Sequence, residues 1–333
     1  MIELNQSANE ISASNFKIPS FSDVYLACQT VSKYLKPTPL LHSRQLSHLL
    51  DCEAYLKLEN LQPTRAFKVR GGVWYMSRMK PTLGRKGIIT ASTGNHAQSL
   101  AYAGKLFDIP VRVVMPEGVP QGKIDSTKDL GAEVILHGSY FEQALEHAMM
   151  LGVKEGFQFV HGINEPILYE GVGTMHLEIF QELPDVEVVF NPIGGGSGIG
   201  GASIVYKSLN PKIRLIGAQA QGASAFYQSW KSGSLIKSSE VKTKAEGLAT
   251  SRAYELPMEI LQHGLDDIVL LSEEELANGV KTIFETTRQV AELSGAASTA
   301  AAMKIKETIR GKKVAMVLTG GNISSEMFSQ IIR

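Results

Sequence analysis

The sequence predicts an α/β protein built from two doubly wound lobes with mostly parallel sheets, and three observations support this. Short apolar, β-branched runs alternate with segments of helical length, which is the order that βαβ units require. The chain has 333 residues, which exceeds one minimal core and suits a large α/β domain or two intimate domains. No linker-like stretch separates two halves, so we expect the chain to cross between the lobes.

The expected elements alternate along most of the chain. A helix capped by Ser22 and Asp23 runs to about Tyr34. Strands are expected at 53–58, 87–91, 111–115, 133–136, 157–160, 186–190, 214–219 and 313–318. Further helices are expected at 95–106, 120–130, 141–151, 202–209, 272–293 and 298–309. The polar stretch 232–252 is expected to form a surface loop, and the first eighteen residues a loose arm.

Composition limits the partners and the compartment. Lys plus Arg and Asp plus Glu balance at 33 each, so no global basic field favours nucleic acid. Only two cysteines, Cys28 and Cys52, occur, which suits a reducing compartment rather than a disulfide framework. The N-terminus lacks the apolar core of a signal peptide, and no apolar run reaches the roughly 20 residues of a membrane span. We therefore expect a cytoplasmic protein that does not enter a membrane.

A glycine-rich stretch at 191–201 lies between an expected strand and an expected helix. Backbone N–H groups at such a junction point outward from a positive helix end and favour a phosphate. Residues 196–201 also satisfy the dinucleotide pattern G-x-G-x-x-G, although no acidic residue follows the next strand, which ends at Gln219. Two other small polar segments, 92–96 and 319–322, follow expected strands, so all three should meet at one ligand-binding edge.

Six ordered motifs resemble one family. They are Phe67-Lys68-Val69-Arg70-Gly71, Ser92-Thr93-Gly94-Asn95-His96-Ala97-Gln98, Glu170-Gly171-Val172-Gly173-Thr174, the glycines at 194–198, Glu292-Leu293-Ser294-Gly295-Ala296 and Thr319-Gly320-Gly321-Asn322. In this order they are similar to the fold type II pyridoxal-phosphate enzymes, the threonine dehydratase and serine racemase group. The resemblance runs from about Phe21 to the C-terminus. It implies the tryptophan synthase β-like fold with pyridoxal 5'-phosphate in the cleft between the lobes.

The resemblance also implies which residues bind the cofactor. Lys68 would hold it covalently and act as a catalytic base, since an apolar wall and nearby cations disfavour the ammonium form. Phe67 would pack beside the ring, Asn95 would bond its phenolic oxygen, and Thr319 would face the pyridine nitrogen. The phosphate would lie on the loop formed by Gly194, Gly195, Gly196, Ser197 and Gly198.

The segment after the expected strand 87–91 would bind the substrate carboxylate, with backbone N–H groups and hydroxyls from Ser92, Thr93, Gly94, Asn95 and His96. Thr93 is a second catalytic candidate, because racemases of the group use a serine in that place. His96 is either a catalytic base or a satisfied structural histidine, and the second interpretation is favoured. Glu292 is either an acid near the ring or a helix residue that supports the loop around Thr319.

The resemblance further implies a large cofactor-binding domain, residues 1–80 and 163–333, and a smaller mobile α/β domain, residues 85–160. It also implies a homo-oligomer, a dimer or a tetramer. Biosynthetic threonine dehydratases carry an additional C-terminal regulatory domain, for which no room is expected before Arg333, so the biodegradative type is the closer likeness.

The expected activity is cofactor-dependent β-elimination, which deaminates L-threonine and L-serine to a 2-oxo acid and ammonia. A hydroxyl at the pyridine nitrogen leaves a weak electron sink, which favours elimination over transamination. The alternatives within the family are a serine or aspartate-type racemase and a hydroxyaspartate dehydratase. Gln219, Ala223 and Ala225 replace the acids with which serine racemases bind a divalent metal, so no metal site is expected.

Departures from the family pattern keep further interpretations open. Arg65-Ala66 stands where relatives commonly have Gly-Ser. Arg65 would contact either an acidic group of the substrate or only solvent, and the same two interpretations are open for Arg252. A second class of function is a nicotinamide-dependent oxidoreductase that uses the G-x-G-x-x-G match. A third is a non-catalytic binding protein that has lost turnover through the Arg65-Ala66 change.

Overall fold

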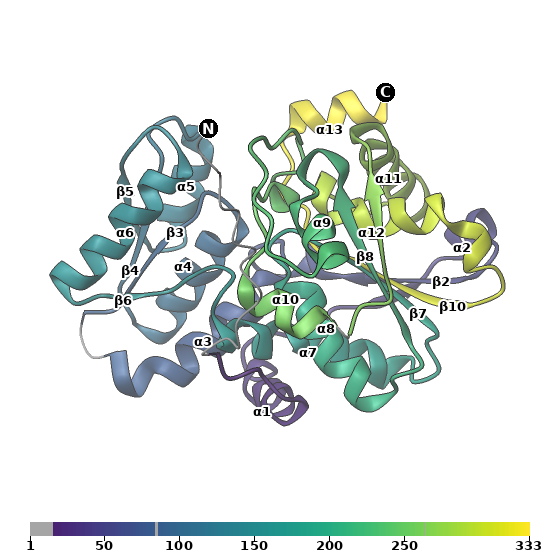
Figure 1. Cartoon of the computed structure of the whole chain (residues 1–333), viewed down its shortest axis with the longest axis horizontal. Helices are drawn as coiled ribbons and strands as arrows, with labels where there is room; N and C mark the ends of the chain where they lie inside the picture. The colour runs from purple at the N-terminus through teal and green to yellow at the C-terminus, as the bar shows by residue number, and fades with distance from the viewer. Residues whose placement is uncertain (1–15, 84–85, 263) are drawn as a thin grey trace, which may run out of the picture.

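The computed structural model describes residues 16–83, 86–262 and 264–333 (Figure 1). Most of the expected N-terminal arm therefore lies outside the described residues. The strands are β1 (Leu40–His42), β2 (Glu53–Leu58), β3 (Ile88–Ala91), β4 (Val111–Met115), β5 (Glu133–Leu136), β6 (Gln158–Phe159), β7 (Val188–Pro192), β8 (Arg214–Ala220), β9 (Asp267–Leu271) and β10 (Lys313–Leu318). Four of them, β2, β4, β5 and β10, begin and end where the sequence predicts.

The described helices surround these strands. They are α1 (Phe21–Val31), α2 (Arg44–Leu50), α3 (Lys68–Leu83), α4 (Asn95–Phe107), α5 (Gln121–Asp129), α6 (Phe141–Glu155), α7 (Pro166–Glu182), α8 (Ser197–Leu209), α9 (Ala225–Ser232), α10 (Glu255–Leu261), α11 (Glu273–Thr287), α12 (Leu293–Lys304) and α13 (Ser325–Ile332). Short 3-10 turns include η1 (Glu59–Leu61) and η3 (Glu246–Leu248).

The strands form two sheets that lie in separate parts of the molecule (Figure 1). The six-stranded sheet has the order β1-β2-β10-β7-β8-β9, in which only β1 is antiparallel to its neighbour. The four-stranded sheet, β5-β4-β3-β6, is parallel throughout. The predicted α/β class with mostly parallel sheets is thus confirmed.

Both sheets are buried on two faces, because parallel strands connected by helical crossovers receive helices on each side. In β10, Val314, Met316 and Leu318 pack into the core that contains α11 and α12. The alternate residues Ala315 and Val317 pack into the core that contains α7 and α8. In the four-stranded sheet, α3 and α4 cover one face and α6 covers the other.

Several predicted helix boundaries are wrong. The first helix is capped by Ser20, whose side chain and Asp23 form a reciprocal capping box. Helix α8 begins at Ser197, inside the glycine-rich stretch, rather than at residue 202. The expected helix 272–293 ends at Thr287, because Arg288 adopts a left-handed conformation with φ of 60°. The next helix then begins at Leu293 instead of Ser298.

The longest element that the sequence prediction missed is α7, which contains the motif at 170–174. Its glycines are required by close packing, since a Cβ on Gly171 would lie 2.7 Å from Gly71 Cα on α3. The expected surface loop 232–252 is also more structured than predicted. Its turn η3 buries Leu248, and a Cβ on Gly194 would lie 2.0 Å from the carbonyl oxygen of Gly247. This segment therefore covers part of the glycine-rich stretch.

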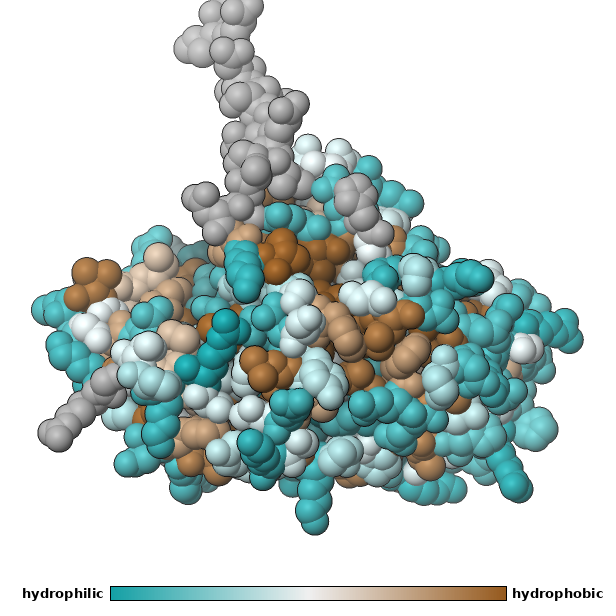
Figure 2. Space-filling model, turned by 90° about the horizontal axis from the view of Figure 1, so that it is seen from below, coloured by the Kyte–Doolittle hydropathy of each residue, from teal (hydrophilic) through white to brown (hydrophobic). Residues whose placement is uncertain are grey.

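The surface is mixed in character. Figure 2 shows hydrophobic side chains gathered toward the middle of one face, with hydrophilic side chains around them. Among the residues that the structure describes, no helix is both long and apolar enough to cross a lipid bilayer. Within the same residues, no cluster of three or more His, Cys, Asp or Glu side chains is arranged to hold a metal ion.

Candidate active site

Lys68 is fixed at the first turn of α3 by pairing of the preceding segment with the end of β10. The Phe67 N–H donates to the Thr319 carbonyl oxygen at 3.0 Å, and the Gly321 N–H donates to the Arg65 carbonyl at 2.9 Å. Ala66 and Gly320 form an antiparallel bridge between these bonds. The pairing brings two motifs that lie some 250 residues apart in sequence into contact.

The Lys68 amine lies in an environment that disfavours its charge. Its Nζ donates to Ser197 Oγ at 2.7 Å and lies 5.3 Å from the centroid of the Phe67 ring. Burial of the amino group lowers its pKa to about 8, although the residue as a whole is only half-buried. The predicted contribution of neighbouring cations is not found: Arg65 is exposed, and Arg70 is neutralised by carboxylates. Burial alone therefore increases the fraction of free amine.

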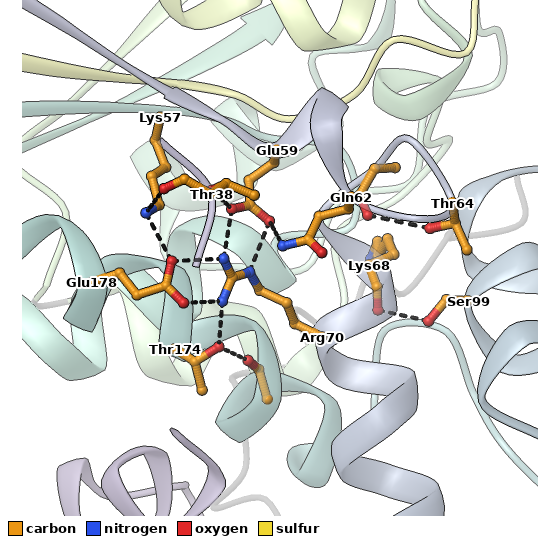
Figure 3. A network of polar contacts seen from close by, with 12 residues as sticks. Thr38, Lys57, Glu59, Gln62, Thr64, Lys68, Arg70, Ser99, Thr174 and Glu178 are labelled. Atoms are coloured by element: carbon orange, nitrogen blue, oxygen red, sulfur yellow. Dashed lines mark hydrogen bonds and ion pairs between the residues drawn. The ribbon is translucent and has the colours of Figure 1, made fainter. Parts of the chain in front are cut away.

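Arg70 anchors the same helix through a network of buried polar contacts (Figure 3). It is fully buried and donates to Glu59 through Nε at 2.8 Å and to Glu178 through Nη1 at 2.6 Å. Lys57 Nζ adds an ion pair to Glu178 at 2.7 Å. Ser99 Oγ, from α4, donates to the Lys68 carbonyl oxygen at 2.6 Å. These contacts hold the backbone of Lys68 between the two sheets.

The glycine-rich loop joins β7 to α8 beside Lys68. Gly196 has a φ of 95°, which favours glycine, and a Cβ there would lie 2.6 Å from Pro257. Ser197 begins α8, is 2% exposed and supplies the hydroxyl that Lys68 contacts. The first turn of a helix leaves N–H groups without intrahelical partners, and the helix dipole makes this end positive. The loop is suited to a phosphate monoester.

A second polar group of the site bridges the two sheets. Asn95, the first residue of α4, donates from Nδ2 to Glu292 Oε1 at 2.9 Å. Asn322 Nδ2 donates to Asn95 Oδ1 at 2.8 Å and to the Thr64 carbonyl at 3.0 Å. Burial raises the pKa of Glu292 to about 7. The structure thus supports both readings of Glu292, a buried acid and a residue that holds the loop after Thr319, since its N–H donates to Gly320.

The remaining predicted residues lie at or just before the start of α4, next to Asn95, and at the end of β10, next to Phe67. Gly94 has open space where a Cβ would be, and the half-buried Thr93 hydroxyl makes no hydrogen bond among the described residues. His96 is buried and its Nε2 lies 3.2 Å from Thr90 Oγ1, while burial lowers its pKa to about 3. These contacts favour the structural interpretation of His96. Thr319 Oγ1, at the end of β10, lies 3.5 Å from the Ser294 carbonyl.

Sequence reasoning missed two parts of the site. Asn322 was visible within a motif at a strand end, but nothing in the sequence indicated that it would contact Asn95. The turn η3 carried no motif, yet Glu246 forms an ion pair at 2.6 Å with Lys123 of α5. This pair joins the segment over the glycine-rich loop to a helix of the four-stranded sheet.

The donor set fits pyridoxal phosphate. An amine that contacts a hydroxyl and, among the described residues, no anion suits an aldehyde. A glycine cradle at a helix end suits a phosphate, and the Asn95 and Thr319 side chains offer polar contacts. Asn191 Oδ1, just before the cradle, is buried and has no hydrogen-bond partner among the described residues, so a polar acceptor beside the loop is left for a ligand or water.

The chain matches the family described as "Pyridoxal-phosphate dependent enzyme" over residues 31–320. It belongs to that family. The nicotinamide alternative is thereby excluded, in keeping with the buried Gln219 at the end of β8 where a dinucleotide site would need an acid.

Relatives of this pyridoxal-phosphate-dependent enzyme cover most of its length. The L-threonine ammonia-lyase of Thermotoga maritima is 39% identical, over 94% of this chain and 78% of that protein. The L-threo-3-hydroxyaspartate ammonia-lyase of Saccharomyces cerevisiae is 32% identical, over 95% of this chain and 97% of that protein. The structure of threonine deaminase isoform 2 from Solanum lycopersicum superimposes with a TM-score of 0.88 at 30% identity, covering 99% and 98% of the two chains.

Proposed function

We propose that this enzyme is an ammonia-lyase that deaminates L-threonine and L-serine by β-elimination, with a 2-oxo acid and ammonia as products. The observation that carries the proposal is the Lys68 amine, which bonds a hydroxyl rather than a carboxylate and whose pKa burial lowers to about 8. Such an amine is partly uncharged at neutral pH and can act as nucleophile and base. Similarity to a threonine ammonia-lyase and a threonine deaminase supports the substrate class.

The cofactor would be held by residues of both sheets. Lys68 would bind its aldehyde; the phosphate would lie on Gly194, Gly195, Gly196, Ser197 and Gly198; the ring would meet Phe67, Asn95 and Thr319. Pyridoxal phosphate supplies an electron sink for the electrons released at the substrate Cα. The Thr319 side chain offers a hydroxyl, which donates to a neutral ring nitrogen but does not stabilise a cation. Such a contact would favour rapid loss of a β-hydroxyl over transamination.

The protein's own side chains would then move the protons. Lys68 Nζ takes the Cα proton, and Ser197 Oγ, within hydrogen-bond distance, keeps the amine beside the loop. The backbone N–H groups of residues 92–96, at the positive end of α4, bind the substrate carboxylate. There is open space at Gly94, and the Thr93 hydroxyl makes no hydrogen bond among the described residues. Both features leave room for the substrate carboxylate.

A second candidate is the deamination of 3-hydroxyaspartate, which the similarity to a hydroxyaspartate ammonia-lyase supports. Arg65 and Arg252 are exposed cations on segments near the site. Racemisation is a further candidate, for which Thr93 would be the acid–base group on the face opposite Lys68. The methyl group of threonine restricts its rotamer, so we expect racemisation to be minor.

We further propose that residues 85–160 form a smaller domain that moves relative to residues 1–80 and 163–333, and that the enzyme is a cytoplasmic homo-oligomer, a dimer or a tetramer. The four-stranded sheet falls within the first of these ranges. Small-angle scattering with and without substrate would detect the movement, and sedimentation would give the number of subunits.

The function is tested with the purified protein supplied with pyridoxal phosphate. We expect a yellow protein that releases 2-oxobutanoate from L-threonine, with L-serine and 3-hydroxyaspartate assayed in parallel. Lys68→Ala should abolish release, whereas Lys80→Ala, at an exposed position near the end of the same helix, should leave it unchanged. Wild-type turnover by Lys68→Ala, or a protein that gains no absorbance from the cofactor, would refute the proposal.

A further inference from the structure

Glu292 carries a buried carboxyl group that the mechanism above does not use. It is the N-cap residue of α12, and its Oε1 accepts a hydrogen bond from Asn95 Nδ2 at 2.9 Å. A Cβ on Gly320 would lie 2.5 Å from the same oxygen, so one side of the carboxyl group packs directly against the Gly320 backbone. No lysine or arginine within the described ranges forms an ion pair with it. Burying an ionised carboxyl group without a cation beside it lowers the stability of the folded protein, so such a group is expected to have a function.

Its neighbours form a chain of hydrogen bonds in which each amide can point only one way. The Thr64 carbonyl is purely an acceptor, so Asn322 must present Nδ2 to it. The same Nδ2 donates to Asn95 Oδ1, which turns the Asn95 nitrogen toward Glu292. An ionised carboxyl group is also purely an acceptor and therefore enforces the same orientation from the other end. Asn95 is left with one N–H for a ligand.

We propose that Glu292 is a positioning residue, whose ionised carboxyl group orients the Asn95 amide so that its second N–H serves the bound cofactor. The inference rests on the proposed contact between Asn95 and the cofactor. It assigns to Glu292 a role through Asn95 and not a contact with the reacting atoms. Asn95 begins the helix after β3, whereas Glu292 begins a helix on the six-stranded sheet, so the contact also aligns the two halves of the site.

The orientation should depend on pH. A protonated carboxyl can donate as well as accept, so the orientation of Asn95 is then enforced only from the Asn322 end, through one hydrogen bond instead of two. Burial raises the pKa of Glu292 to about 7, with a smaller contribution from the charge of Glu246 on η3. The other groups that face it are uncharged: the Asn95 amide on α4, the Asn322 backbone after β10 and the Ser294 hydroxyl on its own helix. We therefore expect the transition near neutral pH.

The test measures the dissociation constant of pyridoxal phosphate for the apoenzyme between pH 5.5 and 8.5. The variants are Glu292→Gln, which cannot ionise, and Glu292→Asp, which ionises but is one methylene too short. For each variant we take the ratio of its dissociation constant to that of the wild type. This ratio should be about fivefold larger at pH 8.5 than at pH 5.5, because one hydrogen bond contributes about that factor. Lys68 also titrates in this range, but it does so in every variant and cancels in the ratio.

Glu165→Gln is the matched control, because Glu165 is also a half-buried N-cap residue whose pKa burial raises. Its ratio should not change with pH. The thermal midpoint of each apoenzyme is recorded as well: a purely structural role for Glu292 would change the midpoint and leave the ratio flat.

The outcomes separate this inference from the proposal on which it rests. A flat ratio for Glu292→Gln, or for Glu292→Asp should the glutamine variant not fold, overturns the role of Glu292. Asn95→Ala tests the contact itself: if it binds the cofactor as tightly as the wild type, the proposed role of Asn95 is wrong. Weaker binding by Asn95→Ala together with a flat ratio would refute the inference alone.

Discussion

Lys68 and Arg70 lie two residues apart at the start of α3, yet their surroundings are opposite. Arg70 is enclosed by the carboxylates of Glu59 and Glu178 (Figure 3). Burial alone would lower its pKa, but the two carboxylates raise that pKa above the usual value. Lys68 has no carboxylate partner among the described residues and contacts the hydroxyl of Ser197, so burial lowers its pKa to about 8.

The difference shows how one helix start can be both rigid and reactive. A compensated cation holds its position through five donors in a fixed geometry. Burying an amine without a compensating anion lowers the stability of the folded protein. It also makes the amine more reactive, because a larger fraction of it is uncharged at neutral pH. The ion network behind the helix can therefore retain Lys68 where its own contacts would not.

The largest expected effect comes from breaking the network. Arg70→Met leaves Glu59 and Glu178 buried without their principal partner, which we expect to lower the free energy of unfolding by about 3 to 5 kcal/mol. Urea denaturation of the apoenzyme measures this. Arg310→Met, at an exposed position, should change stability by no more than about 0.5 kcal/mol. A small effect of Arg70→Met would mean that water compensates the two carboxylates.

Replacing the reactive residue should have the opposite sign. In the wild-type apoenzyme, both folded and unfolded Lys68 are protonated below about pH 8, so the full cost of burying the charge is present there. Between about pH 8 and the ordinary value of 10.5 the folded amine is neutral first, so stability rises with pH.

Lys68→Met removes that cost and that pH dependence. We expect a gain on the order of 2 kcal/mol at pH 7, less than the full shift implies because the residue is partly exposed. The gain should shrink as the pH approaches 10.5, while activity is lost at every pH. Parallel urea titrations at pH 7 and pH 10 check this, and equal differences at the two values would contradict it.

The smallest effect concerns Arg65, the third cation of the stretch. Arg65 has a φ of 54° at the position where the resembling family commonly has glycine, a conformation that costs other residues about 1 kcal/mol. Arg65→Gly should raise stability by about 0.5 kcal/mol, since the more flexible unfolded chain offsets part of the relief. Arg310→Gly, where φ is not positive, should lower it. Thermal unfolding of the two variants side by side distinguishes these signs.

Local residue patterns determined much of this protein. Apolar runs predicted eight of the ten described strands, because burial on a pleated surface has a period that a sequence displays, but β1 and β9 were not predicted. The ordered motifs around Lys68, Asn95, the glycine-rich loop and Thr319 predicted the family and the cofactor, which the comparison with known proteins confirmed. The roles of individual site residues remain predictions.

Only the tertiary structure decided which charges are compensated. The sequence suggested that cations beside Lys68 depress its pKa, but Glu59 and Glu178 neutralise Arg70 from other elements. It likewise left Glu292 open, because the hydrogen bond to Asn95 joins residues 197 positions apart. Electrostatic energies depend on distance and burial in space, which neighbours in the chain do not specify. The same holds for η3, which lies in a polar stretch that was predicted as a surface loop and which packs against the glycine-rich loop.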